Sequence, residues 1–305
     1  MSAATPAIAD SIPARAAASH GGTRALRLLR RSTLATVGFV IIAAVILAAL
    51  LAPLLAPHDP IEQSLTRATL PPFWQARGSL DAPLGTDQFG RDVYSRILYG
   101  ARISLSIGVL AALLGAAVGV TAGVLAGFYR GKVDMVVMRF VDLNLAFPLI
   151  LLALAVAAIL GPSLRNLVFV MALTTWMIYA RVVRGITLSL REREFVQAAR
   201  AVGATNGRIM FRHILPNLLA PVMVIFTLEL ARVILMESAL SFLGLGVPPP
   251  TPTWGRMLAE GRSFLTVAPW IATFPGLAIS ITVLGVNFLG DGLRDLLDPR
   301  LRKQT

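Results

Sequence analysis

The chain has 305 residues, of which 56% are hydrophobic and 14% charged, with a formal net charge of +12 and no cysteine. Soluble globular proteins carry about 25% charged residues, so this composition excludes a water-soluble globule and predicts a membrane protein. The high apolar content also excludes a disordered chain. The lack of cysteine excludes thiol catalysis, iron–sulfur clusters and thiolate zinc sites.

Six apolar stretches predict six transmembrane helices, because a helix needs about 20 apolar residues to cross the hydrocarbon core. The expected spans are 34–56, 103–128, 136–160, 165–181, 218–245 and 269–290. The fold class is therefore an all-α membrane protein with six transmembrane helices. We expect a chain divided into an N-terminal tail, a first helix, an external segment, a main helical domain that contains a long loop, and a C-terminal tail. These parts cover 1–32, 33–56, 57–102, 103–290 with its loop at 184–217, and 291–305.

The distribution of basic residues predicts the orientation. An even number of spans places both termini on one side, and with the N-terminus inside, the inner segments hold 19 Lys and Arg residues against 8 in the outer segments. Basic residues are enriched in cytoplasmic loops, so both termini and the 184–217 loop are expected in the cytoplasm. The net positive charge is explained by topology, and we expect no nucleic-acid partner.

A stripe of glycines marks the second span. Gly115, Gly119, Gly123 and Gly127 follow one another at intervals of four residues. This spacing places them on one helix face, where the missing side chains allow another helix to approach closely. We expect these four glycines to pack against a neighbouring helix.

The loop between the fourth and fifth spans predicts two short amphipathic helices. Phe195, Ala198, Ala199 and Val202 recur at helical spacing, Gly203 is suited to a left-handed helix end, and Thr205 or Asn206 is suited to an N-cap. The second helix is expected to end near Pro216. Periodicity alone is compatible with docking into a partner's groove or with lying on the membrane surface.

Three charged residues lie within the fifth span. Glu229 and Arg232 are three residues apart and share a helix face, which predicts an ion pair, and Glu237 follows on nearly the same face. Charge inside hydrocarbon is costly, so these residues are expected to line a transport path or to form a structural pair at an interface. An ion- or proton-coupled transporter or channel that uses them as a relay is the alternative function.

The sequence offers no catalytic or metal constellation. Its three histidines, His20, His58 and His213, lie in three separate segments, and Asp87 and Asp92 stand in a stretch typical of turns. The nearest approach to a phosphate-binding loop, at 127–133, has three residues between its glycines where four are required. We therefore assign no catalytic residue and no metal ligand.

Three stretches resemble one family. The first stretch resembles the EAA loop of ABC importer permeases. It contains Gln197-Ala198-Ala199, then Gly203, and then the sequence His-Ile-Leu-Pro at 213–216. The Gln, in place of the general Glu, and the His, in place of the usual Ile, are typical of the peptide-import branch. Segments 84–105 and 241–261 resemble the C-type permease subunits of dipeptide, oligopeptide and nickel importers. The resemblance extends from about residue 25 to the end of the chain.

The resemblance implies a type I ABC importer permease in the bacterial inner membrane, a transport component and not an enzyme, for peptide cargo. It implies a second homologous permease subunit, two ATPase subunits that bind ATP and Mg²⁺, an extracytoplasmic substrate-binding protein and surrounding lipid as partners, with no cofactor in this chain. It also implies a set of residues that couple the chain to the ATPases. These are Glu194, Gln197, Ala198, Ala199, Gly203, His213, Leu215 and Pro216.

Overall fold

The computed structural model describes residues 33–297, so the predicted tail 1–32 and residues 298–305 lie outside the described residues. Within the described range the chain is helical, and an isolated bridge between Thr86 and Asp92 is its only β pairing. Five helices are long and apolar enough to cross a membrane, and a bent helix pair makes a sixth candidate span. The predicted all-α class is confirmed, and the number of spans is five, or the predicted six if the bent pair counts as one span.

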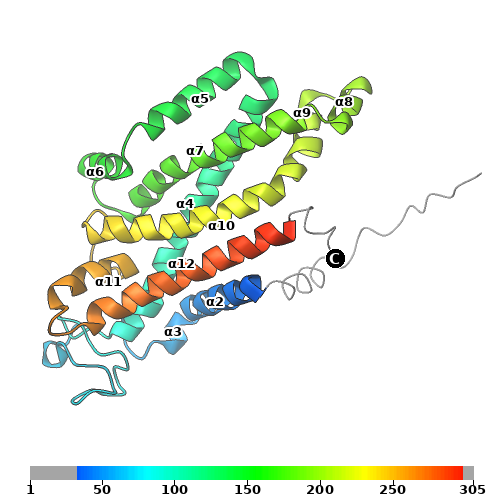
Figure 1. Cartoon of the computed structure of the whole chain (residues 1–305). Helices are drawn as coiled ribbons and strands as arrows, with labels where there is room; N and C mark the ends of the chain where they lie inside the picture. Colours follow the sequence, from blue (N-terminus) through cyan, green and yellow to red (C-terminus); the bar gives the residue numbers. More distant parts are fainter. Residues whose placement is uncertain (1–32, 298–305) are drawn as a thin grey trace, which may run out of the picture.

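The first half of the described chain holds two long helices and the segment that joins them (Figure 1). Its elements are α2 (Thr33–Leu50), α3 (Ala52–Leu55), η1 (Leu65–Arg67) and α4 (Val93–Tyr129). Helix α4 begins at Val93, well before the expected start at 103, because the Asp92 carboxylate accepts hydrogen bonds from the backbone N–H groups of Tyr94 and Ser95. The helix therefore includes the last ten residues, 93–102, of the segment predicted to be external.

The third span is broken. Helix α5 (Gly131–Leu145) and α6 (Leu149–Leu160) meet at an angle of 88°. The sequence predicted one helix over 136–160, but Pro148 cannot donate a backbone hydrogen bond and disfavours a helical conformation at the residue before it. The bend at this proline turns α6 away from the direction of α5 (Figure 1).

The second half of the described chain contains the remaining spans, which are joined by two groups of short helices. Its elements are α7 (Leu164–Leu190), α8 (Glu194–Ala201), α9 (Asn206–Ile209), the π-helical turn η2 (Met210–Ile214), α10 (Leu215–Phe242), α11 (Trp254–Gly261), η3 (Arg262–Phe264) and α12 (Trp270–Leu297). The predicted loop 184–217 therefore begins inside α7 and ends inside α10. The second short helix does not stop near Pro216, because η2 carries it into α10.

Helices α2, α12, α10 and α7 lie side by side in this order, and α4 crosses behind them (Figure 1). Helix α4 packs along α7 through the four glycines of the second span, which we call the glycine seam. A Cβ added at Gly119 would lie 2.2 Å from the carbonyl oxygen of Trp176, and one at Gly123 would lie 2.7 Å from that of Ala180. At this contact the two backbones are closer than any side chain allows.

We expect Gly119→Ala to destabilise the protein, because its methyl group must push α4 away from α7. Overpacking of this kind costs about 1–3 kcal/mol in the free energy of unfolding. Thermal unfolding of the purified protein in detergent measures the change. Gly185→Ala is the matched control, since a Cβ at this α7 glycine meets nothing within 4 Å. Equal unfolding midpoints for the two variants would contradict the role of the seam.

Candidate functional site

A compact hairpin projects from one end of the helix array. It consists of α8, a turn at 202–205, α9 and η2, and we call it the α8–α9 hairpin (Figure 1). Gly203 adopts a φ of +81°, its N–H donates to the carbonyl of Arg200 at 2.9 Å, and the N–H of Ala204 donates to the carbonyl of Ala199 at 3.0 Å. This bond pair is the Schellman ending of a helix, which favours glycine at the left-handed position. The Thr205 hydroxyl then accepts from the N–H of Arg208 and caps α9.

The inner face of the hairpin differs from the predicted one. The sequence pattern assigned Phe195, Ala198, Ala199 and Val202 to a single apolar face, but of these only Ala199 is buried. Val196 takes the buried position instead, since α8 is rotated so that Val196 and Ala199 together face α4 and α7. They share a cluster with Phe128, Val183, Ile209 and Ile214, among other residues.

The exposed face of the hairpin is unusually apolar. Val202 is 84% exposed and Phe211 is 73% exposed, and Phe195 lies with its ring centroid 6.5 Å from that of His213. The uncharged Gln197 is also exposed, together with charged residues that include Glu194. A solvent-facing surface of this kind is suited to contact with another protein.

The hairpin is fastened to the end of α4. In the turn that joins α7 to α8, the Arg191 guanidinium donates to the carbonyl of Phe128 at 2.5 Å, and within α8 the Arg200 guanidinium lies 5.6 Å from the centroid of the Phe128 ring. On the other side, η2 joins the hairpin to α10 without a break. The N–H of Leu215 donates to the carbonyl of Met210, five residues back, so the helix widens by one residue immediately before Pro216, which has no N–H to donate.

The charged residues of α10 separate into two environments. Both Nε and Nη2 of Arg232 donate to Oε2 of Glu229, at 2.9 and 2.7 Å, so the pair expected from their spacing forms. Glu237 is fully buried, and its carboxylate accepts from the Ser241 hydroxyl at 2.7 Å and from the Ser104 hydroxyl of α4 at 3.4 Å. In the described chain no basic side chain lies within ion-pair distance of Glu237, so hydroxyl groups alone solvate it.

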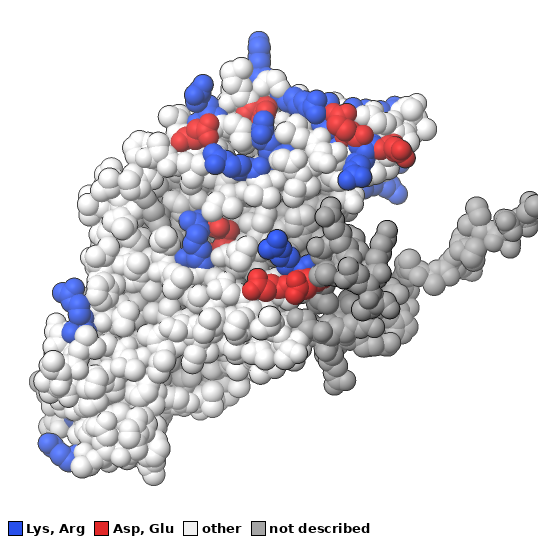
Figure 2. Space-filling model, viewed as in Figure 1, with Lys and Arg blue, Asp and Glu red and all other residues white. Residues whose placement is uncertain are grey.

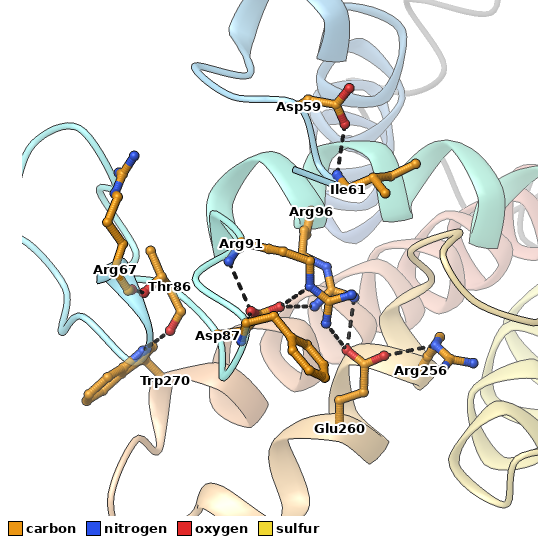
Figure 3. Close-up of polar contacts among 11 residues, drawn as sticks. Asp59, Ile61, Arg67, Thr86, Asp87, Arg91, Arg96, Arg256, Glu260 and Trp270 are labelled. Carbon is orange, nitrogen blue, oxygen red and sulfur yellow. Dashed lines mark hydrogen bonds and ion pairs between the residues drawn. The ribbon is translucent and has the colours of Figure 1, made fainter. Parts of the chain in front are cut away.

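At the opposite end of the array lies a buried ionic cluster that sequence reasoning missed (Figure 3). Asp87 is fully buried and pairs with Arg91 at 2.6 Å and also with Arg96. Both arginines reach Oε2 of Glu260 in α11, at 2.8 and 3.0 Å, and Arg256 pairs with the other oxygen of Glu260 at 2.9 Å. The cluster joins the start of α4 to α11.

Tryptophans reinforce the same junction. The Trp254 indole donates to the carbonyl of Ile97 at 3.0 Å. The Trp270 indole donates to the carbonyl of Thr86 at 3.0 Å, as Figure 3 shows. The segments 84–105 and 241–261 that stand out in the sequence are therefore packed together. The spacing of Asp87 and Arg91 is a sequence signal for a local pair, but no local pattern links either of them to Glu260.

Electrostatics keep Glu260 ionised. Burial opposes its charge, yet the nearby charges of Arg96 and Arg91 outweigh this and lower the pKa of Glu260 below its ordinary value. A carboxylate with a depressed pKa in the folded state stabilises the fold at neutral pH, and this contribution is lost as the pH falls through the lowered pKa.

We expect Glu260→Gln to lower the free energy of unfolding by about 2 kcal/mol at neutral pH. This is less than the usual cost of breaking a buried pair, because Asp87 continues to pair with both arginines. The difference from the unsubstituted protein should shrink as the pH falls below about 4. Thermal unfolding at several pH values measures both effects. Arg67→Gln, which removes a more exposed pair with Asp81, should change little and serves as control. Equal losses in both variants would contradict the importance of burial.

The described residues contain no group of three or more His, Asp or Glu side chains that could hold a metal ion. The features with distinctive geometry are thus the α8–α9 hairpin, the α10 charges and the buried ionic cluster.

Comparison with known proteins identifies the family. Residues 119–303 match the model of the binding-protein-dependent transport system inner membrane component, and residues 22–72 match that of the N-terminal TM domain of oligopeptide transport permease C. The dipeptide transport system permease protein DppC of Alkalihalophilus pseudofirmus is 47% identical over 91% of this chain and 90% of its own length. The protein of the same name from Escherichia coli K12 is 46% identical, covering 90% of this chain and 91% of its own length.

The fold has a counterpart among solved structures. A chain of the MetNI methionine ABC transporter, solved in inward-facing conformations, matches with a TM-score of 0.55 and 20% identity, covering 66% of this chain and 96% of that chain. The likeness confirms the predicted fold of a type I ABC importer permease. Together with the apolar helices, the family matches indicate a multi-pass protein of the inner membrane. The chain belongs to the family of binding-protein-dependent transport system inner membrane components.

Proposed function

We propose that this chain is one permease subunit of an ABC importer for di- or oligopeptides. The relatives named as dipeptide permeases align over about nine-tenths of both chains and carry the proposal of peptide cargo. In this proposal the chain forms half of the translocation path together with a second, homologous permease. An extracytoplasmic binding protein delivers the cargo. The chain itself catalyses no reaction and holds no cofactor, because ATP and Mg²⁺ bind to two partner ATPase subunits.

The α8–α9 hairpin is the proposed contact with an ATPase subunit. Its support is the combination of an exposed apolar surface, at Phe195, Val202 and Phe211, with a rigid attachment to α4 and α10. The coupling residues expected from the sequence are distributed over the hairpin and its junction with α10. Glu194, Gln197 and Ala198 are on the exposed side, whereas Ala199 is buried and positions α8.

The Glu229–Arg232 pair is the proposed charged element of the translocation path. Arg232 retains 34% exposure of its side chain, so one member of the pair can meet a charged peptide terminus. Glu237 of α10 is buried against α4 and is suited to holding α11. The Ser104 hydroxyl, which donates to Glu237, also accepts from the N–H of Trp254 at the start of α11. A proton relay through Glu229, Arg232 and Glu237, the alternative function, has no support from the relatives.

The proposed orientation places the α8–α9 hairpin in the cytoplasm. Charged side chains gather at the end of the array that carries α8 (Figure 2), in agreement with the excess of basic residues in the segments expected inside. The external segment, the ionic cluster and α11 then face the outside.

Cysteine labelling tests this orientation without background, because the chain contains no cysteine. We expect Asn206→Cys to resist an impermeant maleimide in intact cells and to react after permeabilisation, whereas Ser79→Cys should react in both. Both side chains are exposed in this chain, and Asn206 is preferred to Thr205 because the Thr205 hydroxyl caps α9. Labelling in the reverse sense would overturn the orientation and the proposed ATPase contact together.

Gly203 tests the coupling role of the hairpin. A Cβ at Gly203 meets nothing within 4 Å, so Gly203→Val disturbs the turn through its positive φ and not through collision inside the chain. The strain of about 1–2 kcal/mol should shift α8 relative to α9. In the reconstituted importer we expect binding-protein-stimulated ATP hydrolysis to become uncoupled from uptake, while the subunit still folds and inserts in the membrane.

Gly203→Asn is the matched control, because asparagine tolerates the left-handed conformation and should retain most coupling. Normal coupling in the Val variant would show that the hairpin is not the element that transmits ATP hydrolysis.

A further inference from the structure

The side chain of Tyr179 carries a buried polar group without a partner. Tyr179 lies in α7 and is 0% exposed, and its hydroxyl forms no hydrogen bond within the described chain. A buried hydroxyl that lacks a partner lowers the stability of a fold, whereas a phenylalanine would fill nearly the same volume without this cost. Packing alone therefore gives no reason for the hydroxyl.

The helices that surround Tyr179 place it opposite the charged pair of α10. A Cβ added at Gly119 would lie 2.6 Å from the Cβ of Tyr179, so the glycine seam fixes the tyrosine against α4. Two sets of clustered residues, one on each side of Tyr179, give the register of α7 against the antiparallel α10: Met171 with Val233, and Val183 with Leu218. Glu229 and Arg232 fall between the same bounds on α10, and their charges act on the Tyr179 hydroxyl.

Glu229 offers an acceptor that matches this donor. Both donors of Arg232 reach Oε2 of Glu229, and no group of the described chain donates to its other oxygen, Oε1. Glu229 is itself only 5% exposed. A free donor and a free acceptor thus lie on neighbouring helices without being joined. A hydroxyl that donates to a carboxylate forms one of the stronger hydrogen bonds in proteins, because the acceptor is charged.

Arg232 is the more accessible member of the pair. Its side chain is 34% exposed, against 6% for that of Glu229. When the guanidinium turns toward the carboxylate of a peptide, Glu229 is left as a buried charge without its counter-ion, which is strongly unfavourable. A second donor that binds the Glu229 carboxylate at that moment lowers this cost.

We propose that Tyr179 is a positioning residue of the translocation path, whose hydroxyl donates to Oε1 of Glu229 when Arg232 engages the carboxylate of a peptide. This inference rests on the proposed function, in which the Glu229–Arg232 pair meets the cargo. Tyr179 is fully buried, so it acts on the cargo only through Glu229. A change in the packing of α7 against α10 brings the hydroxyl and the carboxylate together.

Uptake of a labelled dipeptide by the complete importer, reconstituted in vesicles, tests the inference. Tyr179→Phe removes only the hydroxyl. We expect the maximal uptake rate to fall about tenfold, the factor that a hydrogen bond to a charged group supplies. The concentration of loaded binding protein that gives half-maximal uptake should not change, because a fully buried residue does not contact that protein. Tyr99→Phe, which removes a hydroxyl from an earlier turn of α4, is the matched control and should retain normal uptake.

Thermal unfolding in detergent separates this role from a structural one. The Tyr179→Phe variant should unfold at the same temperature as the unsubstituted protein or at a higher one, because it no longer buries an unpaired hydroxyl. A lower unfolding temperature would show that the hydroxyl holds the fold together, and the inference would be wrong. Normal uptake by this variant would overturn the inference as well.

A double-mutant cycle shows whether the hydroxyl acts through Glu229. In a Glu229→Gln background the acceptor has lost its charge, so Tyr179→Phe should reduce uptake further by less than about twofold. A further tenfold loss would mean that the two residues act independently, against the inference. Failure of the unsubstituted importer to take up any peptide would instead contradict the proposed function itself.

Discussion

The close approach of α4 and α7 is the contact around which the other helices are arranged. Four glycines let the two backbones meet without intervening side chains, and α4 also contacts α2, α5, α10, α11 and α12. In a bilayer, such packing is favourable because helices gain van der Waals contacts that lipid chains cannot match at so short a distance. If the glycine seam were widened, both the hairpin at one end of α4 and the ionic cluster at the other would lose their common support.

Helix α4 connects the two ends of the molecule. Its 37 residues extend about 55 Å without a break, from the arginine that enters the ionic cluster to the phenylalanine that supports α8. A displacement of α11 would reach the start of α4 through Glu260, and a displacement of the hairpin would reach the end of α4 through Arg191. If the hairpin contacts an ATPase as proposed, this continuous helix offers a direct mechanical link between the outer face and the nucleotide-binding partners.

The buried charges are accommodated in two different ways. In the ionic cluster, carboxylates and guanidinium groups alternate, so that each charge has an opposite neighbour and the cost of desolvation is offset. Glu237 has no such neighbour in the described chain and depends on hydroxyl groups from two helices. Both arrangements hold α11 in place, at its C-terminal and N-terminal ends respectively. This short helix is therefore among the most firmly held elements outside the spans.

Local spacing in the sequence was sufficient for several features that depend on residues close together in the chain. The left-handed turn at Gly203, a cap at Thr205 or Asn206 and the Glu229–Arg232 pair each involve atoms separated by a few residues, so propensity and periodicity predict them, and the structure places the cap at Thr205. Interactions between distant segments left no such pattern. Only the folded chain could bring Glu260 to Asp87 and its arginines, or rotate α8 so that Val196, and not Phe195, faces Phe128. The angle between α5 and α6 is also decided by packing, because a proline predicts an interruption but the neighbouring helices determine the direction in which the chain continues.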